Sequence, residues 1–162
     1  MYIPKWSKEM IITFCGHSSY KSSKEDEERL LNLFEEVILD EQVEFYLGNY
    51  GDFDIFALKC AIRYKENHTS SKIKFITPYL DKWLNKNKEA LEKLYDEIIY
   101  PNLEHVPPRF AILKRNEWMI DQSDYVFAYV KTHYGGAYKT LLYARRRKKP
   151  YHNLFQGDYE LY

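Results

Sequence analysis

Short apolar runs alternate along this chain with longer segments in which apolar residues recur every three or four positions. The short runs have the length and the β-branched and aromatic content of buried strands. They cover residues 11–15, 43–47, 72–77, 124–130 and 151–154. The longer segments begin at Ser22 or Ser23, at Asp52, at Arg109 and at about residue 137. Their spacing predicts amphipathic helices between the strands.

Alternating strands and helices indicate a parallel sheet, because parallel neighbours need crossover connections that cover both faces. We therefore predict an α/β fold, a single Rossmann-like three-layer domain with a mainly parallel sheet of about five strands. The length of 162 residues fits one domain over 1–162, with a core at about 10–154.

The stretch 79–108 departs from this pattern. It is rich in lysine and asparagine, contains Pro101, Pro107 and Pro108, and has one possible short helix at 89–98. Long segments without regular structure inside a compact domain are usually functional or disordered. We therefore expect an irregular flap here, which either closes on a ligand or is simply mobile.

Three of the predicted strands lead directly into glycines. These are Gly16 after the first strand, Gly48 and Gly51 after the second, and Gly135 and Gly136 after 124–130. Carboxyl ends of parallel strands share one edge of a sheet, and the helix N-termini that follow present free N–H groups that favour anions. The sequence therefore predicts one phosphate-binding cradle at this edge.

Charge and composition narrow the partners. Lysine plus arginine equals aspartate plus glutamate, 24 of each, so the net charge is zero. Binding of nucleic acid depends strongly on positive charge, so we do not expect nucleic acid as a partner. The basic run 145–149 closes a predicted helix, where cations complement the helix dipole. No segment reaches membrane-spanning length and residues 1–10 lack a signal peptide, so we expect a cytoplasmic protein with no membrane contact.

The chain has 16 tyrosines. Exposed tyrosine offers rigid amphipathic surface, which suits base stacking or a subunit interface, and we expect a homo-oligomer. Tyr50, Tyr79 and Tyr134 fall in loops after strands, where a ring can stack on a base or simply pack. The two cysteines and the scattered histidines lack metal-ligand spacing, so we predict no metal site and no cofactor.

Several motifs together resemble the SLOG superfamily, which groups DprA/Smf-like, YpsA-like and LOG-like Rossmann domains. The resemblance rests on residues 13–17, on 48–54 followed by Ala57, on Arg115-Asn116, on Ser123-Asp124, and on Gly135-Gly136 with Thr140 and Ala144. It is closest to small bacterial YpsA-like proteins. It implies a single domain that binds nucleotides or molecules derived from them, sometimes in phage-defence signalling, and that often self-associates.

Two branches of the superfamily fit less well. The LOG-like branch hydrolyses cytokinin nucleotides through a glutamate three residues after its motif threonine, and this chain has Tyr143 there. The DprA-like branch binds single-stranded DNA through a basic surface, which the neutral net charge disfavours.

The candidate ligand-binding residues lie in the loops after the strands and on the segment around Arg115, whose guanidinium can fork onto a phosphate. They are Gly16, His17, Ser18, Gly48, Asn49, Tyr50, Gly51, Asp54, Pro78, Tyr79, Arg115, Asn116, His133, Tyr134, Gly135, Gly136, Lys139 and Thr140. Asp54 is the candidate acid–base group, unless it only caps a helix. His17 and His133 follow strand ends and can meet over a bound ligand.

Three functions follow in order of preference. The first is binding of a nucleotide or a nucleotide-derived small molecule without turnover. The second is hydrolysis of an N-glycosidic or phosphate bond in such a ligand, with Asp54, His17 or His133 as catalytic groups. The third is binding of single-stranded nucleic acid, or subunit assembly, through the tyrosine-rich surface.

Overall fold

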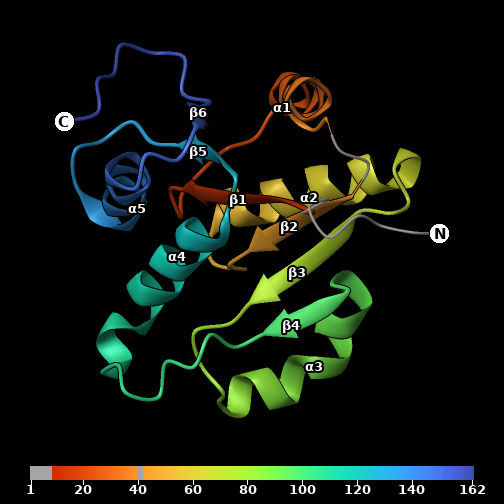
Figure 1. Ribbon diagram of the computed structural model, residues 1–162, viewed down its shortest axis with the longest axis vertical. Coiled ribbons are helices and arrows are strands. Elements are labelled where there is room, and N and C mark those ends of the chain that lie inside the picture. Colours follow the sequence, from red (N-terminus) through yellow and green to blue (C-terminus); the bar gives the residue numbers. More distant parts are fainter. Residues whose placement is uncertain (1–8, 40–41) are drawn as a thin grey trace.

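The fold is seen in a computed structural model that describes residues 9–39 and 42–162 (Figure 1). The expectation about a signal peptide in residues 1–10 falls mostly on residues outside these ranges. Within the described residues no helix combines the length and the apolar content that crossing a membrane requires.

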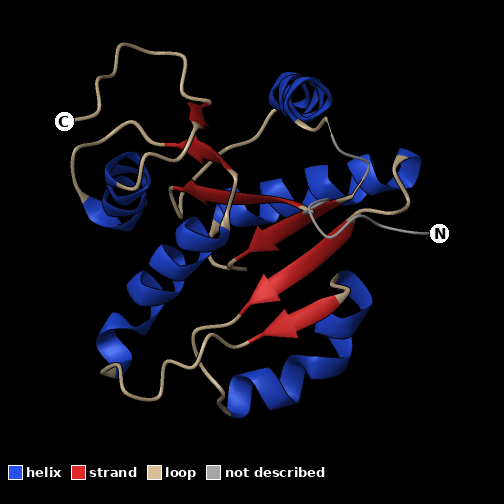
Figure 2. Cartoon of the chain, in the orientation of Figure 1, coloured by secondary structure: helices blue, strands red, loops and turns tan. Residues whose placement is uncertain are grey.

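One parallel sheet of six strands forms the middle of the domain (Figure 2). The strands are β1 (Met10–Gly16), β2 (Val43–Leu47), β3 (Lys72–Ile76), β4 (Glu97–Ile99), β5 (Tyr125–Tyr129) and β6 (Tyr151–Asn153). Their order is β4-β3-β2-β1-β5-β6, and every neighbouring pair is parallel. The predicted α/β class, the single domain and the parallel sheet are confirmed, with six strands in place of about five.

Helices cover both faces of this sheet. They are α1 (Lys24–Val37), α2 (Asp52–Asn67), α3 (Lys82–Leu94), α4 (Ala111–Gln122) and α5 (Gly135–Arg146). Buried residues of α1, α2 and α3 share one large core cluster with β1, β2 and β3. Residues of α4 and α5 form two smaller clusters on the opposite face. The result is the three-layer arrangement predicted from the alternating pattern.

The segment 79–108 differs from the irregular flap that the sequence suggested. Its first part forms α3, which starts at the cap Asp81, whose side chain accepts a hydrogen bond from the Leu84 N–H at 3.0 Å. Leu84 and Leu91 are buried against the core while the lysines face solvent. The three residues of β4 then pair with β3, so packing of two leucines and one short ladder orders most of the segment.

Aromatic rings fill the larger core. Phe34 of α1 is fully buried, and its ring lies within 6.1 Å, centroid to centroid, of the rings of Phe14, Phe45, Tyr64 and Phe127. These contacts join α1 and α2 to three adjacent strands. The packing of a single helix residue against all of them fixes the helical layer on the sheet.

The order of the strands creates the place where a ligand can bind. The chain runs from β1 outward to β4 and then returns to place β5 on the other side of β1. The helices that follow β1 and β5 therefore leave toward opposite faces, and a crevice opens between the carboxyl ends of these two strands. Rossmann-like sheets bind ligands at such a switch point.

Replacing Phe34 by alanine should lower the free energy of unfolding by about 3–5 kcal/mol, because the change leaves a cavity among four rings. Urea unfolding followed by circular dichroism measures this loss. Leu39→Ala is the matched control, since Leu39 is 91% exposed and its loss should cost less than about 0.5 kcal/mol. Equal effects of the two changes would contradict the described core.

Candidate functional site

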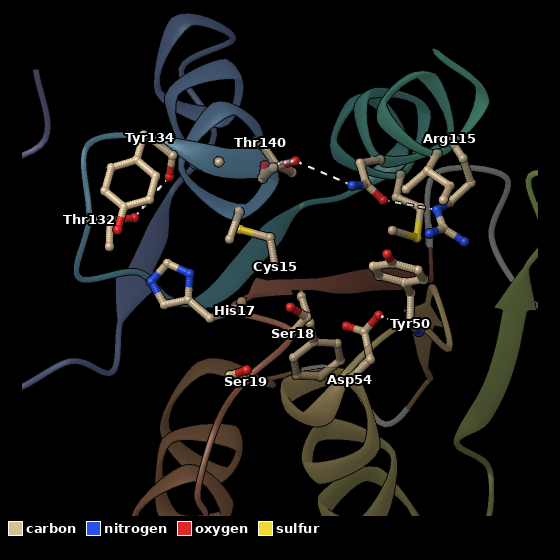
Figure 3. A pocket seen from close by; sticks show the side chains of 18 of the residues that line it. Cys15, His17, Ser18, Ser19, Tyr50, Asp54, Arg115, Thr132, Tyr134 and Thr140 are labelled. Atoms are coloured by element: carbon tan, nitrogen blue, oxygen red, sulfur yellow. Dashed lines mark hydrogen bonds between the residues drawn. The ribbon is translucent and has the colours of Figure 1, made fainter. Parts of the chain in front are cut away.

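A cavity of about 490 Å³ lies at the switch point between β1 and β5 (Figure 3). We call it the main pocket. Its walls come from the loops after β1, β2 and β5, the first turns of α2 and α5, and one face of α4. The lining residues are Phe14, Cys15, Gly16, His17, Ser18, Ser19, Tyr50, Asp54, Ile112, Arg115, Asn116, Met119, Lys131, Thr132, Tyr134, Gly135, Gly136, Ala137 and Thr140. Its size is within the usual range for ligand sites.

The main pocket gathers many of the residues that the sequence singled out. These are Gly16, His17, Ser18, Tyr50, Asp54, Arg115, Asn116, Tyr134, Gly135, Gly136 and Thr140. They come from segments up to 124 positions apart in the sequence and meet because parallel strands end at one edge. Gly48, Asn49, Pro78 and Tyr79 instead line a smaller groove beside it.

Three candidates line neither cavity. Gly51 has a φ of 87°, and a Cβ there would lie 2.6 Å from the Cα of Ser18, so this glycine serves a tight turn before α2. Lys139 is exposed on α5. His133 stacks on the rings of Tyr159 and Tyr162, at 4.7 and 4.5 Å between centroids.

His133 therefore does not meet His17 over a ligand. Its Nε2 lies 2.6 Å from the carbonyl oxygen of Glu160, to which it donates, and the residue holds the carboxyl-terminal segment against the loop after β5. The expected pair of histidines is not formed, because the last residues of the chain fold back onto one of them.

The glycine loops that follow β1, β2 and β5, which we call the three exits, differ in how much space they leave beside the glycine. A Cβ at Gly16 would come within 2.2 Å of the Phe53 ring, and one at Gly48 within 2.9 Å of the Arg115 guanidinium. At Gly135 and Gly136 no atom lies within 4 Å of such a Cβ. The first two glycines allow close packing inside the protein, and only the third exit has open space beside its glycines.

The open exit is the N-terminus of α5. Tyr134 precedes the helix, and its side chain makes no capping hydrogen bond. Gly135 and Gly136 line the main pocket. Their N–H groups are the first of the helix, and the Tyr134 side chain does not cap them. Together with the helix dipole they favour an anionic group.

Arg115 is 1% exposed, and its hydrogen bonds are to other groups of the protein. Its Nη1 donates to the carbonyl oxygens of Gly48 at 2.9 Å and of Ile76 at 2.7 Å, and its Nε donates to Oδ1 of Asn116 at 2.9 Å. Burial lowers its pKa to about 10, which the charge of Asp54 partly opposes, so it stays cationic at neutral pH. Nη1 therefore holds two strand ends and Nε holds Asn116, so the predicted fork of these two donors onto a phosphate is wrong.

Asp54 lies in the first turn of α2 beside the main pocket. Its Oδ2 accepts a hydrogen bond from the Tyr50 N–H at 2.9 Å, so it helps to hold the turn before the helix. Burial raises its pKa to about 6, although this hydrogen bond and the charge of Arg115 act in the opposite direction. The carboxyl group is therefore close to its titration range at neutral pH.

His17 is a neutral hydrogen-bond acceptor. Its Nε2 accepts from the backbone N–H of Lys131 at 3.0 Å, so the proton of the ring is on Nδ1. Burial lowers its pKa, and the charge of Lys131 lowers it further. The contact ties the loop after β1 to the loop after β5 across the crevice.

Several lining residues escaped the sequence analysis. Lys131 and Thr132 follow the end of β5, and this position after a strand end, which pointed to His133, points equally to them. Ile112 and Met119 share one face of α4 with Arg115, and the spacing of three and four residues would have found them. Burial also raises the pKa of the Cys15 thiol, which argues against a thiolate in the pocket.

Among residues 9–39 and 42–162, no three His, Cys, Asp or Glu side chains form a group that could hold a metal ion.

Two solved structures share this fold. DNA processing protein A (DprA) from Streptococcus pneumoniae matches with a TM-score of 0.60 and 14% identity over 88% of this chain. DNA processing protein A from Helicobacter pylori, described in terms of a unique single-stranded DNA binding mode, matches with a TM-score of 0.59 and 17% identity over 88% of this chain. The chain spans 49% and 63% of those proteins. No protein-family model and no curated protein matches it.

These neighbours correct two expectations from the sequence. A nucleotide-derived small molecule was the preferred ligand, and nucleic acid was not expected as a partner. These two solved proteins are DNA processing proteins, and one is described by how it binds single-stranded DNA. Net charge was a weak basis for excluding nucleic acid, because it averages over the whole surface, whereas a binding site depends on the groups that line it.

The two kinds of glycine should respond differently to alanine. Gly48→Ala should lower the free energy of unfolding by about 1–3 kcal/mol, because the new Cβ collides with the Arg115 guanidinium. Gly136→Ala should leave stability unchanged or raise it by up to about 1 kcal/mol, since open space surrounds it and alanine favours a helix. Urea unfolding of both variants tests this. Equal losses would contradict the assignment of one glycine to packing and the other to the pocket.

Proposed function

We propose that this chain binds single-stranded nucleic acid in the main pocket. The observation that carries the proposal is the combination of an open helix N-terminus with exposed tyrosine rings on two sides of one cavity. The fold shared with two DNA processing proteins supports it. The narrower resemblance to YpsA-like proteins stays a prediction from the sequence motifs.

The N-terminus of α5 is the proposed phosphate position. The N–H groups of Gly135 and Gly136 supply donors, and the absence of side chains there lets a phosphate approach the backbone. Lys131 lines the same wall and is exposed, so its ammonium adds a mobile positive charge. A phosphodiester has one charge, which this small set of donors can match.

Two tyrosines are the proposed stacking platforms. Tyr134 is 74% exposed and Tyr50 is 59% exposed, and they stand on opposite sides of the main pocket (Figure 3). Aromatic rings stack on bases of any sequence, and each stacked base contributes about 1–3 kcal/mol. The arrangement is therefore suited to an unpaired strand, whose bases are free to stack on both sides of one bound phosphate.

Neutral net charge is compatible with this mode of binding. The basic run 145–149 lies at the carboxyl end of α5, and the 12 residues of this helix place it about 18 Å from the phosphate position. The proposed site uses few phosphate contacts and relies more on stacking. Its affinity should therefore depend only modestly on salt.

Charge reversal at Lys131 should distinguish binding in the main pocket from binding elsewhere on the surface. Lys131→Glu should weaken binding of a fluorescent oligothymidylate by roughly tenfold and reduce the slope of log K against log salt by about 0.7–1. Lys148→Glu is the control, because it makes the same change beyond the far end of α5. Fluorescence anisotropy measures both. A larger effect at Lys148 than at Lys131 would place the nucleic acid elsewhere.

Binding should tighten as the pH falls from 7.5 to 6. Over this range Asp54, whose pKa burial raises to about 6, becomes partly protonated and repels a nearby phosphate less. Asp54→Asn keeps an oxygen for the Tyr50 N–H, so at pH 7.5 it should bind several-fold more tightly than the unchanged protein and lose this pH dependence. Asp52→Asn, in the same turn but outside the pocket lining, should behave like the unchanged protein. An unaltered pH profile in Asp54→Asn would refute the role of this carboxyl group.

A further inference from the structure

We propose that the smaller groove beside the main pocket is a second base-binding position on the same strand. This inference rests on the proposed function and extends it to a further nucleotide. The groove has a volume of about 250 Å³, and we name it the Trp83 groove after the exposed residue in its lining. Tyr50, Pro78, Tyr79 and Trp83 supply its aromatic and apolar walls.

The Trp83 groove continues the main pocket along the edge of the sheet. The two cavities are adjacent, because Tyr50, Ile112 and Arg115 line both of them. Strands β5, β1, β2 and β3 are neighbours in that order, and their ends span about 14 Å at the usual spacing of strands. At about 3.4 Å per stacked nucleotide this is a path of up to about four nucleotides.

The chemistry of the groove fits a base better than a phosphate. Trp83 is 50% exposed in the first turn of α3, which leaves much of its side chain accessible. Asp81 also lines the groove, and its carboxylate repels a phosphate. The cationic side chain in the lining is Arg115, which is buried and bonded to two carbonyl oxygens. Flat apolar walls beside a negative charge favour a flat, uncharged occupant, and in a nucleic acid this is an unpaired base.

The walls are held in place before any ligand binds. The hydroxyl of Tyr79 donates to the carbonyl oxygen of Pro108 at 2.8 Å, which fixes its ring. Asn49 has a φ of 51°, and its Oδ1 accepts from the hydroxyl of Tyr95 at 3.0 Å, which holds the turn that carries Tyr50. Asp81 caps α3 and so positions Trp83. A preorganised groove loses little conformational entropy on binding.

Oligonucleotide length should reveal the second position. Trp83→Ala should weaken binding of oligothymidylates of about eight nucleotides by roughly tenfold, which is within the range for one stacked base. It should leave the affinity of the shortest oligonucleotide that still binds unchanged, because that ligand fills only the main pocket. Trp83→Phe should keep most of the affinity. Leu94→Ala is the control, since it removes another exposed apolar side chain at the opposite end of α3.

A set of oligonucleotides with one abasic position each provides the second measurement. In the unchanged protein, removal of a base from the main pocket should weaken binding, and removal of one further base, the one in the Trp83 groove, should weaken it as well. In Trp83→Ala the loss at this further position should vanish. Equal affinity of Trp83→Ala and the unchanged protein for every length would overturn the second position while leaving the main pocket intact. Failure of any oligonucleotide to bind the unchanged protein would overturn the proposed function, and this extension with it.

Discussion

The contact on which the site depends most is the hydrogen bonding of one buried guanidinium to two strand ends. Arg115 reaches from α4 to the carbonyl oxygens of Gly48 and Ile76, which follow β2 and end β3. Asn116 continues the connection, because it accepts from Arg115 and donates to Thr140 of α5 at 3.4 Å. A buried cation is costly unless its donors are satisfied, and the two carbonyl oxygens and Asn116 satisfy Nη1 and Nε. The same group forms part of the wall of both cavities.

This arrangement changes the meaning of the glycines at the sheet edge. Gly48 makes room for the guanidinium, and Gly16 makes room for the ring of Phe53, so both serve close packing. The open space at Gly135 and Gly136 then becomes the part of the edge where a phosphate can approach the backbone. A cavity with one helix N-terminus and several aromatic rings favours stacking over dense phosphate contact, which agrees with a neutral chain.

Much of the fold could be predicted from local pattern. The runs at 43–47 and 124–130 are apolar enough to be buried strands, and the alternation with helices implied the parallel sheet and its ligand-binding edge. The strand Glu97–Ile99 has three residues, too few for any period to show. Helix α3 buries only Leu84 and Leu91, seven positions apart, so its lysine- and asparagine-rich sequence suggested an irregular flap.

The site was less predictable because its details depend on contacts between distant segments. The sequence shows that Arg115 is near a strand end but cannot show that backbone carbonyl oxygens occupy its donors. It places His133 beside a strand exit, yet Tyr159 and Tyr162 fold back onto it. Net charge was the least informative property, since it gives no position for any charged group.

Photochemical cross-linking tests the central claim most directly. A single-stranded oligonucleotide with photoreactive thymidines is irradiated with the protein, and mass spectrometry identifies the modified residues. The account predicts cross-links at Tyr134 and Tyr50, which flank the main pocket. Cross-links confined to the basic run 145–149 would contradict it.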